Sequence, residues 1–484
     1  MKSTELTYPG DDQPVNIPEF PNFSQPPMSF SDRMTPLELR ASAGLASIFG
    51  LRMLGMFVIL PVFAVYAESL PGGVSHTLVG IALGAYGLTQ AILQIPFGWL
   101  SDRIGRKPTI YAGLLLFAIG SFVAAAAQDI YLIIGGRVLQ GSGAISAAVI
   151  AMTADLTREE HRTKAMALIG STIGFSFALS LILGPLLFHL IGVPGIFALT
   201  GVLALSAIAV VFAVIPNPQH SYSSAGDAQS SRLLAVMRDG QLMRLNFGIF
   251  SLHAVLMALF IVVPFALRNA GLRVERHWLM YLPVMLCSFI MLLPAIVFAE
   301  KKAKLKQVFC AAVVLMLATE VLLPWLLGSL WEIFIGLLAF FTAFNILEAS
   351  LPSLISKFAP PGAKGTAIGV YSSIQFFGAF VGAVASGYLS QHYGTQAVFI
   401  FGVVLIAIWL IPAFTMKVPV AAETKIYPIP AMDKRRASGL SQRLASVPGV
   451  QEALVIAAEG VAYVKVDSSV FDEQNVIRLI AGEA

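Results

Sequence analysis

A compact run of charged residues and glycines lies between two long apolar segments of the sequence: Gly98-Trp-Leu-Ser-Asp102-Arg-Ile-Gly105-Arg106-Lys-Pro108. Arg106 can form an ion pair with Asp155 further along the chain. Asp102 can face the positive N-terminus of another helix, and the segment that begins near Lys364 is the expected partner. Contacts of this kind form in one conformation and break in another, so the run predicts a two-state latch at a hinge between helices.

Three other residues of the run have expected roles in the latch. Gly98 permits close helix approach and Gly105 a tight turn, because glycine has no Cβ. Arg103 adds a further positive charge. The alternative interpretation is that the charges of this loop are solvated and only set the membrane topology.

Ionisable residues also occur inside apolar segments, where a charge costs at least about 2.5 kcal/mol on insertion scales and requires a partner or an aqueous cavity. Arginine does not release its proton, so proton coupling requires a carboxylate or a histidine beside it. Each such residue could instead be a structural polar group, and the sequence favours none of them. The candidates for proton coupling are Arg52, Arg137, His253, Glu320 and Glu348, with Asp155 and Glu68 nearer the membrane surfaces.

A polar stripe follows one apolar segment, because Tyr86, Gln90 and Gln94 recur at every fourth position and therefore share one helix face. We expect this face to contact protein or water rather than lipid. Asn345 and Gln375 could line the same cavity from the second half of the chain. Hydrogen bonds between packed helices are the alternative role for all five residues.

Composition assigns the chain to a bilayer, since 57% of its 484 residues are hydrophobic, 12% are charged, and the mean hydropathy is +0.79. A helix needs roughly 20 apolar residues to cross about 30 Å of hydrocarbon. Twelve such spans are predicted, at 41–67, 76–100, 108–127, 130–152, 164–188, 193–215, 244–268, 277–299, 305–325, 328–352, 364–388 and 394–416.

Basic residues concentrate on one side of these spans, which predicts that both termini are cytoplasmic. The loops assigned to the cytoplasm contain Arg103, Arg106, Lys107, Arg158, Arg162, Lys164, Arg232, Arg238, Arg244, Lys301, Lys302, Lys304, Lys306, Lys357 and Lys364. The opposite loops contain Arg268, Arg273 and Arg276, a local exception without a sequence explanation. The net charge of +4 thus reflects topology and not nucleic-acid binding.

The predicted organisation is a pair of six-helix bundles with cytoplasmic additions. Ile59-Leu-Pro61 recurs as Val262-Val-Pro264 and Lys164 as Lys364, which indicates an internal duplication and places a substrate site between the halves. The domains are a disordered cytoplasmic N-terminal tail at 1–40, a bundle at 41–215, a central cytoplasmic loop at 216–243, a second bundle at 244–416, a linker at 417–437 and a small cytoplasmic α+β domain at 438–484.

The C-terminal region has its own pattern. Leu440, Leu444 and Val447 have helical spacing, 450–456 and 461–466 read as strands, and Ser469 with Asp472 predicts the cap of a final helix. Because about 47 residues make a marginal core, the unit could recruit a strand from 424–430, dock on the membrane part or pair with another copy. It contains no Cys or His, so no metal site is expected.

The run at 98–107, the segment Arg137-Val-Leu-Gln-Gly-Ser-Gly-Ala144, and Gly174 with Gly184-Pro185 resemble motifs of the major facilitator superfamily, in its drug:proton antiporter branch. With the small tail domain, the chain most resembles YajR-type transporters. The resemblance implies twelve transmembrane helices in two pseudo-symmetric bundles, a ferredoxin-like tail domain without metal ligands, and a part in proton coupling for Arg137. Leu186 departs from the motif, which usually continues with glycine, and this leaves the direction of coupling open.

The expected function is a secondary transporter that works by alternating access in a bacterial inner membrane and exports small amphiphilic molecules by proton coupling. Its expected partners are a small-molecule substrate, protons and the lipid bilayer, with self-association through the tail domain as a further possibility. It needs no cofactor beyond the proton gradient. The alternatives are a proton symporter or facilitator for uptake, and a non-transporting sensor or scaffold. No phosphate-binding G-x-x-x-x-G-K-[ST] motif or nucleophile-base pair suggests an enzyme.

Overall fold

The computed structural model describes residues 34–217, 233–301, 304–360, 363–417, 422–430, 432–457, 460–467 and 471–482. The predicted disordered tail lies almost wholly outside these residues, as does half of the central loop. The end of the tail is nevertheless corrected: α1 begins at Pro36, where Thr35 and Glu38 cap each other's backbone N–H groups.

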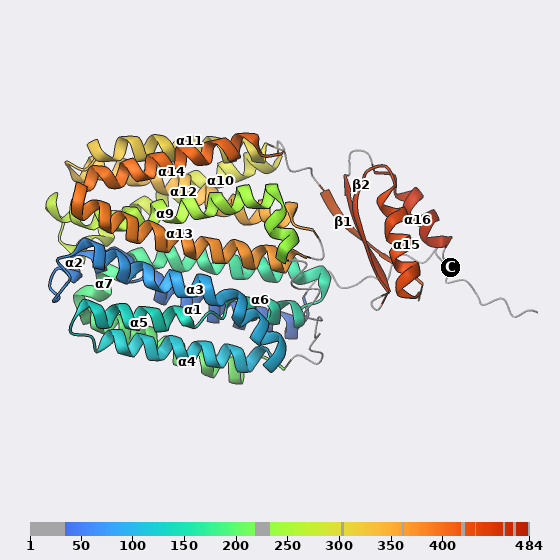
Figure 1. Cartoon of the computed structure of the whole chain (residues 1–484), viewed down its shortest axis with the longest axis horizontal. Coiled ribbons are helices and arrows are strands. Elements are labelled where there is room, and N and C mark those ends of the chain that lie inside the picture. Colours follow the sequence, from blue (N-terminus) through green and yellow to red (C-terminus); the bar gives the residue numbers. More distant parts are fainter. Residues whose placement is uncertain are drawn as a thin grey trace, which may run out of the picture.

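Long helices make up the membrane part (Figure 1). They are α1 (Pro36–Phe57), α2 (Leu60–Ala67), α3 (His76–Ile104), α4 (Arg106–Ala125), α5 (Ile130–Ser142), α6 (Ser146–Asp155), α7 (Glu159–Ala213), α9 (Gly240–Asn269), α10 (Trp278–Lys301), α11 (Leu305–Leu322), α12 (Leu330–Phe358), α13 (Lys364–Tyr393) and α14 (Thr395–Thr415), with short 3₁₀ turns at Val274–Arg276 and Leu323–Trp325.

Eleven helical segments of the described chain are long and apolar enough to cross a membrane, and one of them runs over 50 residues, Lys164–Ala213. A straight helix of that length would extend about 75 Å, more than twice the thickness of the hydrocarbon core. Its backbone is broken at Gly192, where φ is +65°. The segment therefore consists of two helices, which correspond to the predicted spans 164–188 and 193–215.

Two spans that the sequence predicts as continuous are interrupted. The span 41–67 divides into α1 and α2 just before Pro61, which has no N–H to donate to the helix. The span 130–152 divides into α5 and α6, and Gly143 leaves the helical conformation between them. Both breaks lie in the half formed by α1–α7.

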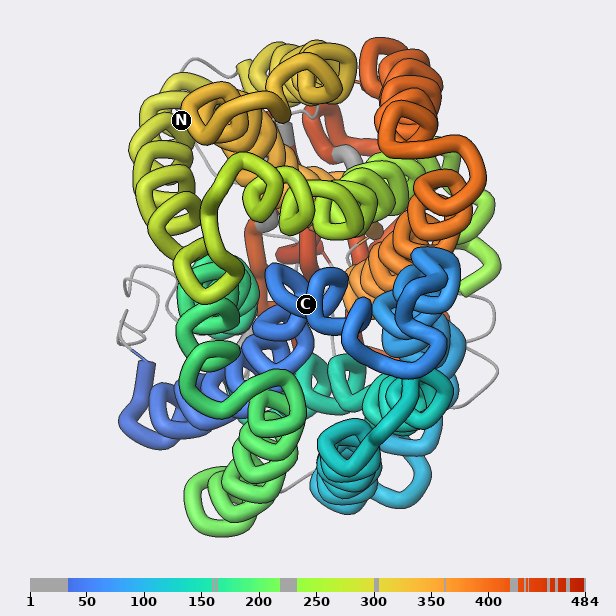
Figure 2. Tube along the Cα trace, turned by 90° about the vertical axis from the view of Figure 1, so that its left-hand side faces the viewer, coloured from blue at the N-terminus to red at the C-terminus, as the bar shows by residue number. Residues whose placement is uncertain are grey.

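The two halves of the membrane part lie side by side, with α1–α7 in the lower part of Figure 1 and α9–α14 in the upper part. Figure 2 shows the same division in end view. Small residues allow α3 and α13 to meet backbone to backbone: a Cβ on Gly80 would lie 2.3 Å from the carbonyl oxygen of Ala383, and one on Gly387 2.4 Å from that of His76.

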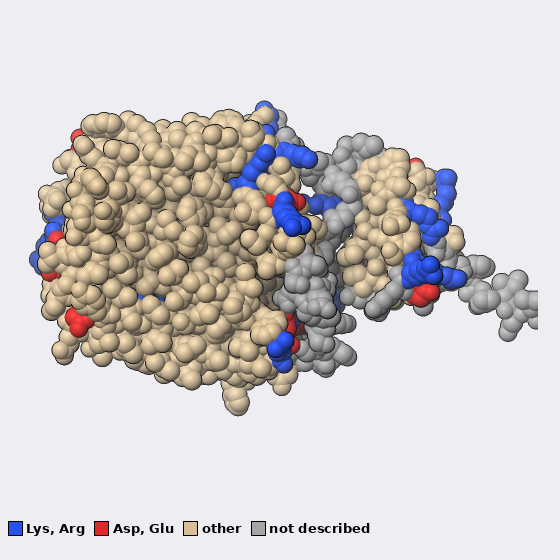
Figure 3. All heavy atoms as spheres, viewed as in Figure 1, with Lys and Arg blue, Asp and Glu red and all other residues tan. Residues whose placement is uncertain are grey.

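The surface of the membrane part divides into zones (Figure 3). A broad band around the bundle is almost free of charged side chains on the face shown, and Lys and Arg gather at the end near the small domain. We call this end the small-domain end, and the opposite end, where α2 lies, the far end. An uncharged band of this kind is typical of a lipid-facing surface.

The C-terminal region forms a three-stranded antiparallel sheet of order β1-β3-β2 with two helices. Its elements are β1 (Ala422–Pro428), α15 (Lys434–Ala445), β2 (Val450–Ile456), β3 (Val461–Asp467) and α16 (Glu473–Ala481). The two predicted strands are confirmed. Leu440, Leu444 and Val464 are buried in its core.

Two details of the sequence analysis are corrected in this region. β1 lies inside the predicted linker 417–437 and pairs with β3, so the option of a recruited strand is the one observed. Asp472 caps α16 by accepting from the backbone of Gln474, whereas Ser469 lies outside the described residues. Lys465 of β3 donates to the carbonyl of Lys357 at the end of α12, 2.5 Å away, which joins the small domain to the bundle.

Candidate functional site

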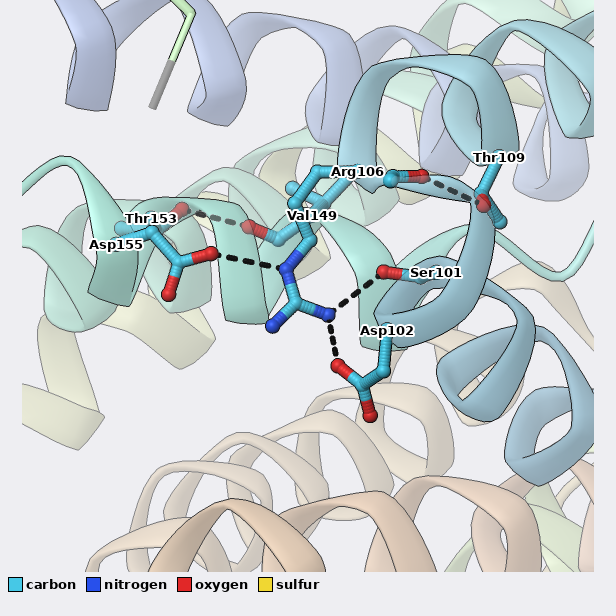
Figure 4. A network of polar contacts seen from close by, with 8 residues as sticks. Ser101, Asp102, Arg106, Thr109, Val149, Thr153 and Asp155 are labelled. Atoms are coloured by element: carbon cyan, nitrogen blue, oxygen red, sulfur yellow. Dashed lines mark hydrogen bonds and ion pairs between the residues drawn. The ribbon is translucent and has the colours of Figure 1, made fainter. Parts of the chain in front are cut away.

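The predicted latch residues meet at the small-domain end (Figure 4). Arg106, the first residue of α4, donates from Nε to Oδ2 of Asp155 at 2.9 Å and from Nη1 to Oγ of Ser101 at 2.8 Å. Its Nη1 also forms an ion pair with Asp102. Arg106 is only 9% exposed, so one guanidinium neutralises two carboxylates in a largely dry site and joins α3, α4 and α6.

The other residues of the run support this arrangement in different ways. Gly105 adopts φ +100° at the junction of α3 and α4, a conformation that glycine adopts most readily. A Cβ on Gly98 would lie 3.2 Å from Cβ of Ala147 on α6, so Gly98 allows these helices to pack closely. Arg103 takes no part in the ion network: its guanidinium lies 3.5 Å from the ring centre of Trp99.

The ionic contacts of this cluster all join residues of the first half, among the contacts that the described residues show. The predicted pair of Arg106 with Asp155 is present. The expected approach of Asp102 to the N-terminus of α13 stays a prediction, as does the role of the cluster in holding the two halves together. The observed contacts of Arg106 connect α3, α4 and α6 and therefore stabilise one half internally.

The hydrogen bonds and the ion pair that the described residues form between the halves lie at the far end. Glu68, which follows α2, accepts from Nη1 of Arg268 on α9 at 2.5 Å. Oε1 of Gln391 on α13 accepts from the backbone N–H of Thr77 at 3.0 Å and from the hydroxyls of Thr77 and Ser75 at 2.7 and 2.8 Å. Together with the glycine contacts of α3 and α13, these bonds hold the far end closed in this conformation.

Sequence reasoning missed this second cluster, although a signal was present. Arg268 stood out as a basic residue on the wrong side of the membrane, and Glu68 lies 200 residues before it, the same offset that relates Lys164 to Lys364 in the internal duplication. In the helices that carry these two residues the repeat offset is 203, because Pro61 corresponds to Pro264, so Glu68 and Arg268 lie near the ends of corresponding helices but not at equivalent positions. The ion pair accounts for Arg268, and Arg273 has its own partner in Glu275 at 3.3 Å.

A cavity of about 50 Å³ lies between the halves. Ligand pockets for drug-sized molecules measure roughly 300–1,000 Å³, so the cavity is contracted in this conformation. Tyr86 and Phe376 meet across it, with ring centres 6.2 Å apart. Most of its wall is apolar. The residues that line it include Met53, Met56, Phe57, Tyr86, Arg137, Ser146, His253, Met257, Gln375 and Phe376.

The first half contributes two buried arginines to this region, and both lie beside the ring of Tyr86, with Cζ 5.9 Å from the ring centre for Arg52 and 4.9 Å for Arg137. Arg52 donates to Oγ of Ser146 at 3.0 Å and to Oε1 of Gln90. Gln90 in turn donates to Gln94 at 2.7 Å. Of the polar stripe, Gln90 bonds Arg52 and Gln94 bonds Gln90, whereas Tyr86 lines the cavity and the two glutamines are not among its described lining residues.

The second half contributes a carboxylate and a histidine joined by one amide. Nε2 of Gln375 lies 2.8 Å from Nε2 of His253 and donates to Oε1 of Glu348 at 3.4 Å. His253 and Gln375 line the cavity, and Glu348 lies behind Gln375. Nδ1 of His253 and Oε2 of Glu348 have no hydrogen-bond partner in the structure. This trio brings together two of the predicted proton-coupling candidates from α9 and α12.

The remaining predicted residues lie elsewhere. Glu320 on α11 is buried against Gly402 of α14, away from the cavity lining. Asn345 donates to Ser288 of α10 at 3.0 Å and is not among the described residues that line the cavity in this conformation, so its place there stays a prediction. A Cβ on Gly184 would lie 2.5 Å from the carbonyl oxygen of Val58; this glycine, followed by Pro185, lets α7 approach the break between α1 and α2. Gly174 has open space beside it.

No cluster of three or more His, Cys, Asp or Glu side chains that could hold a metal occurs among the described residues. Cys287 and Cys310 are both free thiols. The chemistry available at the cavity is therefore that of buried cations, a carboxylate, a histidine and apolar walls.

Two helical halves that enclose a mostly apolar cavity with buried charged residues beside it are typical of a membrane transport protein, and comparison with known proteins identifies its class. The model of the Major Facilitator Superfamily matches residues 45–376 and 277–457. The chain belongs to this superfamily and is a multi-pass secondary transporter, not an enzyme.

Individual relatives agree with this assignment. The chain is 45% identical over 450 residues to the inner membrane transport protein YajR of Escherichia coli, covering 92% of this chain and 99% of the relative. It is 27% identical over 351 residues to the multidrug resistance protein MdtH of Aeromonas salmonicida, covering 71% and 86%. The crystal structure of the human organic anion transporter MFSD10 superposes with a TM-score of 0.61 at 19% identity, covering 79% of this chain and all of that one, which shows a shared fold alone.

Proposed function

We propose that this protein exports small amphiphilic molecules from a bacterium by exchange for protons, through alternating access of the cavity between its halves. The observation that carries the proposal is the composition of the cavity and its surroundings: apolar walls, Arg137 with Arg52 behind the lining on one side, and His253 and Gln375 with Glu348 behind them on the other. Multidrug resistance relatives such as MdtH support the direction of transport.

Alternating access requires two ends that open in turn. The far end is closed by contacts between the halves, and the corresponding ionic contacts at the small-domain end stay within one half. This asymmetry supports opening at the small-domain end from the present conformation. Asp102 would then bind the N-terminus of α13 in the opposite conformation, when the small-domain end closes.

Glu348 is the proton carrier in this proposal. Gln375 bridges Glu348 to His253 and also reaches the cavity, so a bound substrate and the protonation of the carboxylate compete for one amide. A carboxylate that binds and releases a proton changes charge in the cycle, whereas Arg137 cannot. Arg137 instead provides a fixed positive charge across the cavity.

The proposed topology has twelve crossings, counting the two helices of α7 separately, with both termini and the small domain in the cytoplasm of a bacterium and the bundle in its inner membrane. The basic residues at the small-domain end support this orientation. The order β1, α15, β2, β3, α16 supports a ferredoxin-like small domain. Its edge strands β1 and β2 support self-association, which stays a proposal.

Proton movement in liposomes tests the function. The purified full chain is reconstituted with an acidic lumen and a pH-sensitive dye inside, and naphthalene compounds with a permanent positive, permanent negative or no charge are added outside. Antiport predicts that at least one compound raises the luminal pH as it enters in exchange for protons. A symporter would acidify the lumen with an acidic exterior, and a sensor would carry no compound under either gradient.

Replacing Glu348 or Glu320, two carboxylates within membrane helices, tests which residue carries the proton. Glu348→Gln is expected to abolish proton movement while the compound still exchanges down its own gradient. Glu320→Gln removes another carboxylate within a membrane helix, which is 2% exposed and lies away from the cavity lining, and it should retain coupling. Normal coupling in Glu348→Gln would contradict the assignment.

A further inference from the structure

The transmembrane interior of the first half carries positive charge without a matching acid. Arg52 and Arg137 are 3% and 2% exposed. The acidic residues between Arg52 and Ala213 all lie at helix ends: Glu68, Asp102, Asp129, Asp155, Glu159 and Glu160. Among the described residues, neither arginine forms an ion pair. Two buried guanidinium groups therefore lie near the ring of Tyr86, and neither has an ion-pair partner among the described residues.

Neutral groups satisfy only part of their hydrogen-bonding capacity. Each guanidinium has five N–H donors. Arg52 uses two groups, Ser146 and Gln90, and Arg137 uses Gln140, whose Oε1 lies 2.9 Å from Nη1. The Nε atoms of both arginines are buried without a partner. Buried, uncompensated charges are strongly unfavourable, so this arrangement favours a ligand that supplies the missing acceptors.

The cavity determines what else that ligand must carry. Arg137 lines the cavity directly, and Arg52 lies behind Ser146 and Tyr86, which also line it. The rest of the wall includes Met53, Met56, Phe57, Met257 and Phe376, all apolar. The flexible thioethers of methionine adapt to ligands of varied shape. On the opposite side, the carboxylate of Glu348 accepts a hydrogen bond from the lining residue Gln375.

We propose that the substrate is an amphiphilic organic anion, with an oxyanion group bound by Arg137 and Arg52 and an apolar body enclosed by the methionines and phenylalanines. This inference rests on the proposed transport function, and it names the substrate class of that same cavity. Charge-assisted bonds from a guanidinium to an oxyanion can be bidentate, which would use the N–H groups that the protein leaves free. The cavity must widen to admit such a ligand, as alternating access requires.

Binding by three compounds of one shape tests the proposal. They are naphthalene-2-sulfonate, naphthalene-2-sulfonamide and 2-naphthyltrimethylammonium, measured by calorimetry on the full chain in lipid nanodiscs, with empty nanodiscs subtracted. The anion is expected to bind about tenfold or more tightly than the neutral compound, and the cation more weakly still. This comparison uses the unaltered chain, so it does not depend on any variant that fails to fold.

Variants then locate the charge. Arg137→Gln should lower the affinity for the sulfonate about tenfold and leave that for the sulfonamide unchanged, whereas Arg137→Lys should keep the preference for the anion. Arg276→Gln removes the same charge from an exposed position at the far end and should change neither affinity. Equal affinities for the three compounds, tighter binding of the cation, or an anion preference that survives Arg137→Gln and Arg52→Gln would each overturn the proposal.

The outcome is separable from that of the proposed function. If the sulfonate binds as expected but moves no protons in liposomes, the substrate class stands and proton coupling fails. If the cationic or neutral compound is transported with proton movement and the sulfonate does not bind, coupling stands and the substrate class fails.

Discussion

Both ends of the bundle carry ionic clusters, but one cluster connects helices within a half and the other connects the two halves. At the small-domain end, Arg106 is almost buried and joins Asp102 and Asp155 within one half. At the far end, Glu68 and Arg268 are 39% and 40% exposed and join opposite halves. The small-domain-end cluster is strong because it is largely buried. The far-end pair can break because it is exposed and joins two halves that move. A strong brace inside a half and a weak latch between halves are what a protein that moves its halves as units requires.

The largest effect is expected from Arg106→Ala, which leaves two carboxylates unpaired in a largely buried site and should lower the free energy of unfolding by about 3 kcal/mol. A lower melting temperature in nanodiscs would measure this. Arg103→Ala is the control, since it loses only a stacking contact with Trp99, worth about 0.5–1 kcal/mol. Equal losses from the two variants would show that the cluster is not a brace.

A smaller effect is expected where the halves meet backbone to backbone. Gly387→Ala places a Cβ 2.4 Å from the carbonyl of His76, and overpacking of this kind destabilises by about 1–3 kcal/mol. The far end should open, as measured by spin-label distances between α3 and α13. Gly369→Ala, on the same helix but with nothing within 4 Å, should leave these distances unchanged. Unaltered distances in Gly387→Ala would mean that close packing does not hold the far end.

The far-end ion pair should contribute less, because exposed pairs contribute about 0.2–1 kcal/mol. Glu68→Gln is expected to raise the population with an open far end by no more than about fivefold, in the same spin-label measurement. Exchanging the charges, with Glu68→Arg and Arg268→Glu together, should restore the original population. If Glu68→Gln shifted the free energy between the closed and open far end as much as Arg106→Ala lowers the free energy of unfolding, the two ends would not differ as described.

The smallest effect is expected from an exposed pair that joins no moving parts. Lys425 and Glu473 pair at 3.0 Å in the small domain, and the hydrogen bond from Lys425 lowers the pKa of Glu473 below its ordinary value. The pair therefore stabilises the domain at neutral pH and loses this contribution as the pH falls through the lowered pKa. Glu473→Gln should change hydrogen exchange in β1 and β3 only slightly at pH 7. A large change would show that the exposure of an ion pair does not indicate how much it contributes to stability.

Sequence patterns predicted the parts of the structure that depend on local composition. The apolar spans and the strands 450–456 and 461–466 are present, because hydrophobic length and alternation act on each segment separately. The breaks near Pro61 and Gly143 were missed, since both lie within spans of sufficient apolar length. Tyr86 and Gln375 line the cavity and Asn345 bonds Ser288, a difference that the sequence does not show because an amide side chain can serve either packing or binding.

By itself, the sequence determined that this chain crosses a membrane many times, carries a duplicated architecture and ends in a small α+β unit, because these properties follow from the length, period and repetition of its residues. Apart from the pair of Arg106 with Asp155, which the sequence predicts, only the tertiary structure decided which charges meet. Arg268 bonds Glu68 of the other half, and Arg52 and Arg137 lie beside one tyrosine with no ion-pair partner among the described residues, because helix packing brings together residues 34 to 200 positions apart.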